Sequence, residues 1–191
     1  MTEFIKLWNQ YHRGRRPIGL LLGPDGAKHR FRFDALSGPI RYSNISKCRD
    51  LLLAWQNLLA AAALGEAPCW LVQCHRLSST GFADIANASD PICATRQYGL
   101  PFGFEFLVHE YGGETRWRAH AVETTWFAGK YDALLLDIAE GRAAPTLWVS
   151  SGSGAIFAPS ENGIDLYLTS KSDVDVLTDA LAAERALALG S

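Results

Sequence analysis

The feature that most constrains the fold is a pair of alternating segments around Gly112-Gly113, in the run FGFEFLVHEYGGETRWRAHAVETTW (residues 102–126). Apolar and polar residues alternate on both sides of the two glycines, which is the pattern of a half-buried strand. A glycine pair also suits the positive φ values that a two-residue hairpin turn requires. The run therefore predicts an antiparallel hairpin with one apolar face and one polar face.

The polar face of this hairpin is the first candidate site. If Tyr111 pairs with Glu114 across the glycines, counting outward places Glu105 opposite His120. A histidine beside a carboxylate can act as a base, because the carboxylate raises the pKa of the ring and orients it. Cross-strand pairs of opposite charge are also ordinary on a solvated sheet face. The alternatives are a solvated face, a surface for a partner or ligand, and a catalytic pair.

A second hairpin is predicted where two apolar runs, AIFAP (155–159) and GIDLYLT (163–169), flank an Asn-Gly turn. In the second run, aliphatic residues alternate with Asp165 and Tyr167. We therefore expect Asp165 on the face turned away from the core. There it is either the polar side of a hairpin or the partner of a basic residue.

Helix patterns separate these strands. Apolar residues recur at spacings of three and four between residues 51 and 62, which predicts a long helix that Ser43 or Asn44 caps and that ends at Gly65. Further segments predict an amphipathic turn or helix at the N-terminus, strands at residues 29–34, 69–77 and 146–151, and helices at residues 131–141 and from residue 174 onward.

Because the strands gather in hairpins and not in regular βαβ units, we expect an α+β fold. The sheet should be mostly antiparallel, with helices packed on one face. The 191 residues suit a single domain over 1–191, since no repeat or linker interrupts them. The stretch 78–101 lacks periodicity and is too long for an ordinary connection, so we expect a long loop or a short-helix insertion there.

Charge and cysteine usage narrow the range of partners. A net charge of −2 supplies no broad attraction for nucleic acid. The one basic segment, HRGRRP (residues 12–17), is either a solvated connector or an anion site with Arg16 as the ligand. Neither a signal peptide nor a spanning segment is apparent, so we expect a cytoplasmic protein without membrane contact.

The cysteines do not predict a metal site. Cys69 and Cys74 share a predicted strand but differ by an odd number, so they point to opposite faces. Cys69 and His75 share a face but lie roughly 20 Å apart along a strand, too far for one tetrahedral ion. We expect no metal and no cofactor. Nucleophile and phosphate-loop motifs are also absent, which leans against an enzyme.

Two segments resemble an uncharacterised bacterial family classed only as a domain of unknown function, number 3885. They are IGLLLGPDGAKHRFRFDALSGPIRYSN (18–44) and LWVSSGSGAIFAPSENGIDLYLTS (147–170). The family pattern has an R-F strand, then S-x-x-x-R-Y, and later F-H-P-Y-D-x-G-x-D. The residues that match this pattern are Arg32, Phe33, Ser37, Arg41, Tyr42, Phe157, Pro159, Gly163 and Asp165.

Three residues depart from that pattern: Ala158 replaces the His, Ser160 the Tyr and Glu161 the Asp. If the family uses that His in chemistry, this chain has lost it, which counts against an enzyme. If the two matched segments meet in space, Asp165 should lie within salt-bridge reach of Arg32 or Arg41, beside Tyr42.

The leading hypothesis is a non-enzymatic bacterial protein that binds another protein, in the manner of a toxin-immunity module. The alternative is a small-molecule-binding protein or hydrolase, with a pocket between the polar hairpin face and the 78–101 segment. The candidate binding residues are Arg32, Arg41, Tyr42, Asp165, Glu105 and His120.

Overall fold

The structure is a computed structural model that describes residues 2–19, 22, 29–34, 45–65, 67–77, 97–100, 103–110, 113–171 and 174–179. Its strands form one seven-stranded sheet in the order β1-β7-β6-β5-β2-β4-β3, and every neighbouring pair is antiparallel. The α+β prediction with a mostly antiparallel sheet is therefore confirmed. The strands are β1 (His29–Asp34), β2 (Pro68–Arg76), β3 (Phe104–Glu110), β4 (Gly113–Thr125), β5 (Thr146–Ser150), β6 (Ile156–Ser160) and β7 (Gly163–Leu168).

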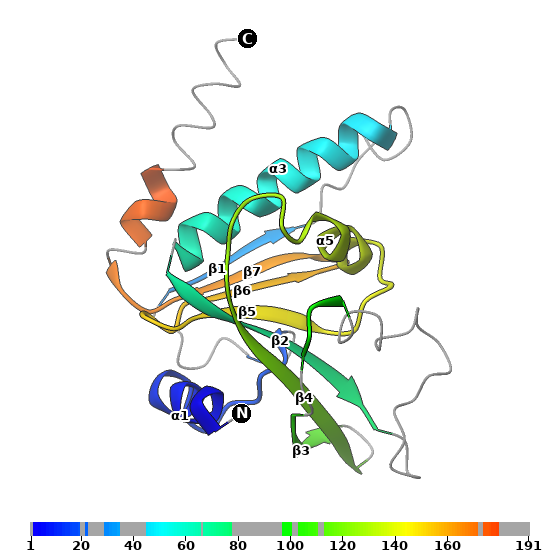
Figure 1. Ribbon diagram of the computed structural model, residues 1–191, viewed down its shortest axis with the longest axis vertical. Helices are drawn as coiled ribbons and strands as arrows, with labels where there is room; N and C mark the ends of the chain where they lie inside the picture. Colours follow the sequence, from blue (N-terminus) through cyan, green and yellow to red (C-terminus); the bar gives the residue numbers. More distant parts are fainter. Residues whose placement is uncertain are drawn as a thin grey trace.

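Helices lie on both faces of this sheet (Figure 1). The helices α3 (Ile45–Leu64) and α5 (Asp132–Ala139) cover one face, and α1 (Thr2–Tyr11) covers the other. The expectation of helices on a single face is wrong in this respect. The reason is that α1 is amphipathic and buries Phe4 and Trp8 against the strands.

Two apolar layers follow from this arrangement. Under α3 and α5, Trp148 of β5 packs against Trp126 and Tyr131, with ring centroids 5.3 and 5.2 Å apart. On the α1 side, the neighbouring residues Leu147 and Val149 join the second layer. Successive residues of a strand point to opposite faces, so a central strand covered on both sides is buried throughout, as β5 and β7 are.

The β3–β4 hairpin exists, but its register is shifted by two residues from the predicted one. Glu110 pairs with Gly113, so Glu105 lies opposite Arg118 and not opposite His120. The predicted Glu105–His120 pair is therefore wrong. Gly113 adopts a φ of 137° as the first residue of β4, not as part of the turn. A shift by two preserves which residues share a face, so the apolar and polar faces are as predicted.

The helix and strand predictions otherwise agree with the structure to within two residues at each described end. Gly65 follows α3 with a φ of 63° and its N–H donates to the carbonyl of Ala61 at 2.9 Å, as in a left-handed C-cap. Residues 174–179 are helical. Most of the 78–101 segment lies outside the described residues. No helix among the described segments has the length and apolar character needed to cross a membrane.

Candidate functional site

The strongest polar cluster is centred on Asp165 of β7. Its side chain accepts hydrogen bonds from two arginines of the neighbouring strand β1. Arg30 donates from Nε and Nη2 to Oδ1, at 3.1 and 2.8 Å. Arg32 donates from Nη1 to Oδ2 at 2.7 Å. Both oxygens of one carboxylate are thus engaged by two guanidinium groups. We call Asp165, Arg30 and Arg32 the arginine cluster.

The sheet register explains why these side chains meet. Arg32 lies directly opposite Asp165 in the β1–β7 ladder, and Arg30 lies opposite Tyr167. The apolar residues that alternate with the arginines, Phe31 and Phe33, pack against the layer under α3. Alternation therefore sends both arginines to the α1 side of the sheet, the side that Asp165 also faces.

Burial of the carboxylate sets the electrostatics of the cluster. Asp165 is only 3% exposed, while the side chains of Arg30 and Arg32 are 32% and 35% exposed. The hydrogen bonds from Arg30 to Asp165 raise the pKa of the Arg30 guanidinium and so keep it charged. Partial burial lowers the same pKa but has the smaller effect. The Arg30 guanidinium carbon also lies 5.7 Å from the centroid of the Tyr167 ring. The buried acid therefore holds two partly exposed cations in fixed orientations.

Of the two predicted partners of Asp165, Arg32 and Arg41, the structure shows the salt bridge with Arg32, and the expectation that Asp165 lies on a face turned away from the core is wrong. That face is covered by α1 and by the chain after it, because Ile18 and Leu22 belong to the same buried layer as Tyr167. Arg30 is the residue that sequence reasoning missed. Its signal was present, since it shares a face with Arg32 in the alternation of residues 29–34.

A recess of about 200 Å³ adjoins this cluster. Asp165 and Gly19 form one part of its wall, and Ser160 and Glu161 at the β6–β7 turn form another. The connection between α5 and β5 supplies the rest, including Pro145. The recess is large enough for a small molecule, since a cavity of about 150 Å³ can bind benzene, and it is lined mainly by small residues. It extends the accessible surface beside the buried carboxylate.

The remaining candidate residues are not brought to this cluster. Arg41 and Tyr42 lie outside the described residues. Glu105 binds Arg118, which donates from Nη2 to Oε1 at 2.6 Å. The ring of His120 lies 5.3 Å from that of His75 on the neighbouring strand. None of the described cavities is lined by Glu105 or His120, and most of the segment predicted to cover them is not described.

The N-terminal basic segment combines exposed arginines with buried ends, because Arg13 and Arg16 are exposed while His12 and Pro17 are buried. His12 is 5% exposed, and its Nε2–H donates to the carbonyl of Gly154 at 2.7 Å. Burial lowers the pKa of His12, and the nearby charge of Arg15 acts in the same direction, while the Gly154 carbonyl opposes both. His12 is therefore a neutral structural contact between α1 and the turn before β6.

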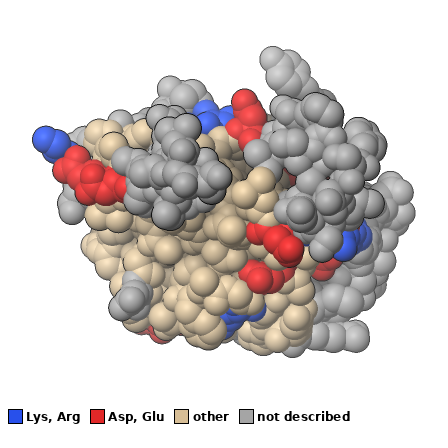
Figure 2. Space-filling model, turned by 90° about the horizontal axis from the view of Figure 1, so that it is seen from above, with Lys and Arg blue, Asp and Glu red and all other residues tan. Residues whose placement is uncertain are grey.

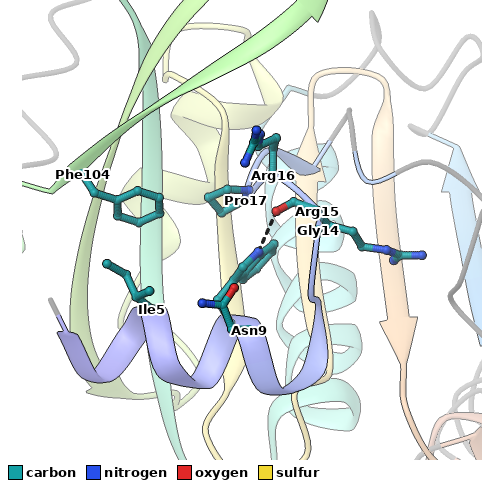
Figure 3. Close-up of a pocket in the computed structure, with 8 residues that line it drawn as sticks. Ile5, Asn9, Gly14, Arg15, Arg16, Pro17 and Phe104 are labelled. Carbon is teal, nitrogen blue, oxygen red and sulfur yellow. Dashed lines mark hydrogen bonds between the residues drawn. The ribbon is translucent and has the colours of Figure 1, made fainter.

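A small cavity of about 200 Å³ lies between α1 and this basic segment (Figure 3). Trp8 donates from Nε1 to the carbonyl of Arg15 at 2.9 Å at its centre. The Arg16 Nε donates to the carbonyl of Leu107 at 3.1 Å, which ties the segment to β3. The guanidinium of Arg15 is directed away from this cavity and toward β7 (Figure 3).

The opposite side of the molecule has a different character. Seen from the side of α3 and α5, the described surface is largely uncharged, with acidic side chains grouped on it (Figure 2). A broad groove of about 560 Å³ runs along α3 there, bordered by Asp50 and Asp132. The carboxylate of Asp132 is engaged by Asn57, whose Nδ2 donates to it at 2.9 Å. Basic side chains are also present on this face, where Arg49 of α3 pairs with Glu140 at 2.8 Å (Figure 2).

The cysteines agree with the expected geometry. Cys69 belongs to the layer under α3 and Cys74 to the layer under α1, so their side chains lie on opposite faces of β2. The described residues contain no cluster of three or more His, Cys, Asp or Glu side chains arranged to hold a metal ion. Burial raises the pKa of the Cys69 thiol to about 11, which disfavours the reactive thiolate.

Comparison with known proteins gives one result. The family model described as Domain of unknown function (DUF3885) matches residues 23–183. The match includes the first segment of the resemblance from residue 23 onward, all of the second segment, and the chain between them. No curated protein and no solved structure gives a significant match.

Proposed function

This chain belongs to the DUF3885 family, whose description assigns no activity, and we propose from the arginine cluster that it is a non-enzymatic protein-binding module. We propose that it acts in the bacterial cytosol. Its partner could be a toxin that it neutralises by binding. One observation carries the proposal: a buried carboxylate fixes two arginines whose guanidinium groups remain about one-third exposed.

Fixed arginines suit recognition. Arginine is enriched in protein interfaces because its planar guanidinium combines several donors with a broad apolar face. Binding by a mobile side chain costs conformational entropy, and Asp165 removes much of that cost beforehand by holding Arg30 and Arg32. The two arginines of the cluster also lie on β1, the last strand at one edge of the described sheet. An edge strand is a usual place for a partner to approach.

The same geometry does not suit acid or base chemistry by Asp165. A catalytic carboxylate needs a free oxygen within hydrogen-bond reach of the substrate. Here both oxygens already accept hydrogen bonds from arginines, and the residue is almost completely buried. The role that the contacts support is to position the two guanidinium groups.

The test uses a photo-crosslinking amino acid placed beside the cluster in the full chain, in its native host. Position 34 is suitable because the Asp34 side chain is 84% exposed and next to Arg32. The matched control is position 127, where Phe127 is 58% exposed and outside the cluster. We expect a protein adduct from position 34 and none from position 127.

The protein identified in this way is then purified and its affinity is measured directly. An Arg30→Gln/Arg32→Gln double variant should bind it at least tenfold more weakly, since two charge-assisted contacts are removed. The proposal would be contradicted if no adduct forms at position 34, or if positions 34 and 127 give equal amounts of adduct. It would also be contradicted if the double variant binds the partner with unchanged affinity.

A further inference from the structure

A third arginine reaches toward the arginine cluster from another part of the chain. Arg15 follows α1, and its side chain points across the sheet toward β7, where Tyr167 and Asp165 lie (Figure 3). Its charge acts on the Tyr167 hydroxyl. Burial raises the pKa of Tyr167, and the negative charge of Asp165 raises it further. The positive charges of Arg30 and Arg15 lower it. The charges of Arg15 and Arg30 therefore both act on the same hydroxyl.

Arg15 also carries an unmet bonding requirement. Its Nη2 is buried and has no hydrogen-bond acceptor among the residues that the structure describes. A buried charged donor without an acceptor is unfavourable and unusual in folded proteins. Arg15 as a whole is only partly buried, so the rest of its guanidinium is closer to the surface than Nη2 is.

The two other arginines share one buried carboxylate. Asp165 accepts hydrogen bonds from Nε and Nη2 of Arg30, and the Tyr167 hydroxyl is a further hydrogen-bond partner of the same guanidinium. On Arg32, Nη1 donates to Asp165, Nε donates to the exposed Asp34 at 3.3 Å, and Nη2 donates to the carbonyl of Asn162 at 3.4 Å, so only the first of these partners is buried. Three arginines against the two carboxylates of Asp165 and Asp34 leave one surplus positive charge.

We propose that Arg15, Arg30 and Arg32 together bind an oxyanion. The group that they take is a carboxylate or a phosphate, with its negative oxygens shared between the guanidinium of Arg15 and those held by Asp165. The oxyanion is then the part of the protein partner that the cluster recognises. This inference rests on the proposed function, because both treat these arginines as binding residues. Guanidinium donors match the oxygen spacing of both groups.

Tyr167 lies beside the arginine cluster. Its hydroxyl donates to the Gly19 carbonyl at 3.5 Å, the upper limit of a hydrogen bond, and the Arg30 guanidinium is its other hydrogen-bond partner. Burial keeps this phenol protonated through its raised pKa, and a protonated hydroxyl is a donor for an anion. The site therefore combines three cations with one neutral donor.

The test is made on the purified protein alone, so it does not depend on finding a partner. Arginine Nε–H signals are followed by NMR at constant ionic strength, with inorganic phosphate or the peptide acetyl-(Glu)₄-amide as the probe. We expect saturable shifts of the Arg15 and Arg30 signals. The variant Arg15→Gln should weaken binding about tenfold, the loss expected for one charge-assisted hydrogen bond.

Arg13→Gln is the matched control, because Arg13 is an exposed arginine two residues away on the same segment. It should leave the affinity within twofold of the wild-type value. If Arg15→Gln is misfolded by circular dichroism, Arg15→Lys replaces it, with weaker binding expected because an ammonium group lacks the planar fork of donors.

The outcomes are separable. Saturable binding of phosphate alone, of the acidic peptide alone or of both supports the oxyanion site and identifies its source. No saturable shift with either probe, or equal loss of affinity in the Arg13 and Arg15 variants, overturns it. A cluster that crosslinks a partner but binds neither probe would retain the proposed function while removing this inference.

Discussion

Arg32 Nη1 donates to Asp165 Oδ2 at 2.7 Å across the β1–β7 ladder, although 133 residues separate the two in the chain. This contact joins the two segments that carry the family resemblance. Asp165 is buried on β7, whereas Arg32 lies on the edge strand β1 and remains about one-third exposed. The pair therefore stabilises the fold and presents a cation at the same time.

The first prediction concerns the variant Asp165→Asn. The amide keeps the shape of the side chain but removes the negative charge that two guanidinium groups share. Breaking a buried pair typically costs about 3–5 kcal/mol, and the one-third exposure of both arginines lowers the expected loss to about 2 kcal/mol. Urea unfolding followed by tryptophan fluorescence measures it.

Asp34→Asn is the control for that experiment. Asp34 also contacts Arg32, at 3.3 Å, but its side chain is 84% exposed. Solvent screens such a pair, so this variant should unfold at nearly the same urea concentration as the wild type. A similar loss of stability in both variants would mean that burial does not strengthen the Asp165 contacts.

The sequence predicted that Asp165 pairs with Arg32 or Arg41, because two separate patterns agreed. Alternation in residues 29–34 and 163–168 fixed which side chains share a face, and the family resemblance suggested that the segments meet. Alternation treats Arg30 and Arg32 alike, so it could not show that both reach one carboxylate. That depends on the register of two strands distant in the chain, which no local pattern specifies.

Burial of Asp165 was unpredictable for a related reason. Its strand alternates like one with a single wet face, yet α1 and the chain after it cover the second face. Local periodicity reports which residues share a face but not what lies over that face. The Glu105–His120 error has a different origin, since a hairpin of the same parity can close one residue earlier on each strand.

The second prediction concerns Gly154, which has a φ of 73° and lies against Tyr11. A Cβ atom there would be 2.3 Å from Cγ of the Tyr11 ring. The variant Gly154→Ala combines a left-handed backbone with an overlap in a packed contact, so it should lose about 3 kcal/mol of stability. Differential scanning calorimetry of the two proteins gives the difference.

The neighbouring variant Gly152→Ala provides the comparison. A Cβ atom at Gly152 meets nothing within 4 Å, and the residue does not need a positive φ. Its melting temperature should stay close to that of the wild type. Equal losses from both substitutions would contradict the specific contact between Tyr11 and Gly154.

The third prediction concerns thiol reactivity. Burial raises the pKa of Cys69 to about 11 and also raises that of Cys74, and both side chains are inaccessible. At pH 8, native Cys69 should react with iodoacetamide at least about 100-fold more slowly than in the unfolded chain, because the thiolate is the reactive form. Peptide mapping by mass spectrometry assigns the rate to each cysteine. Rapid labelling of native Cys69 would disprove its burial.

The fourth prediction is that His12 makes stability fall in acid. Its folded-state pKa is lowered, chiefly by burial, so the unfolded chain binds the proton more readily. The free energy of unfolding contributed by His12 is therefore complete above the unfolded pKa of about 6.5 and decreases as pH falls toward the folded pKa. Urea titrations between pH 7.5 and 5 should show a smaller decline of the free energy of unfolding in His12→Gln than in the wild type.

The control variant is His109→Gln, which removes an imidazole from a side chain that is 80% exposed. If the free energies of unfolding of the wild type and of His12→Gln decline in parallel as the pH falls, then His12 is not a neutral, buried residue that binds the Gly154 carbonyl.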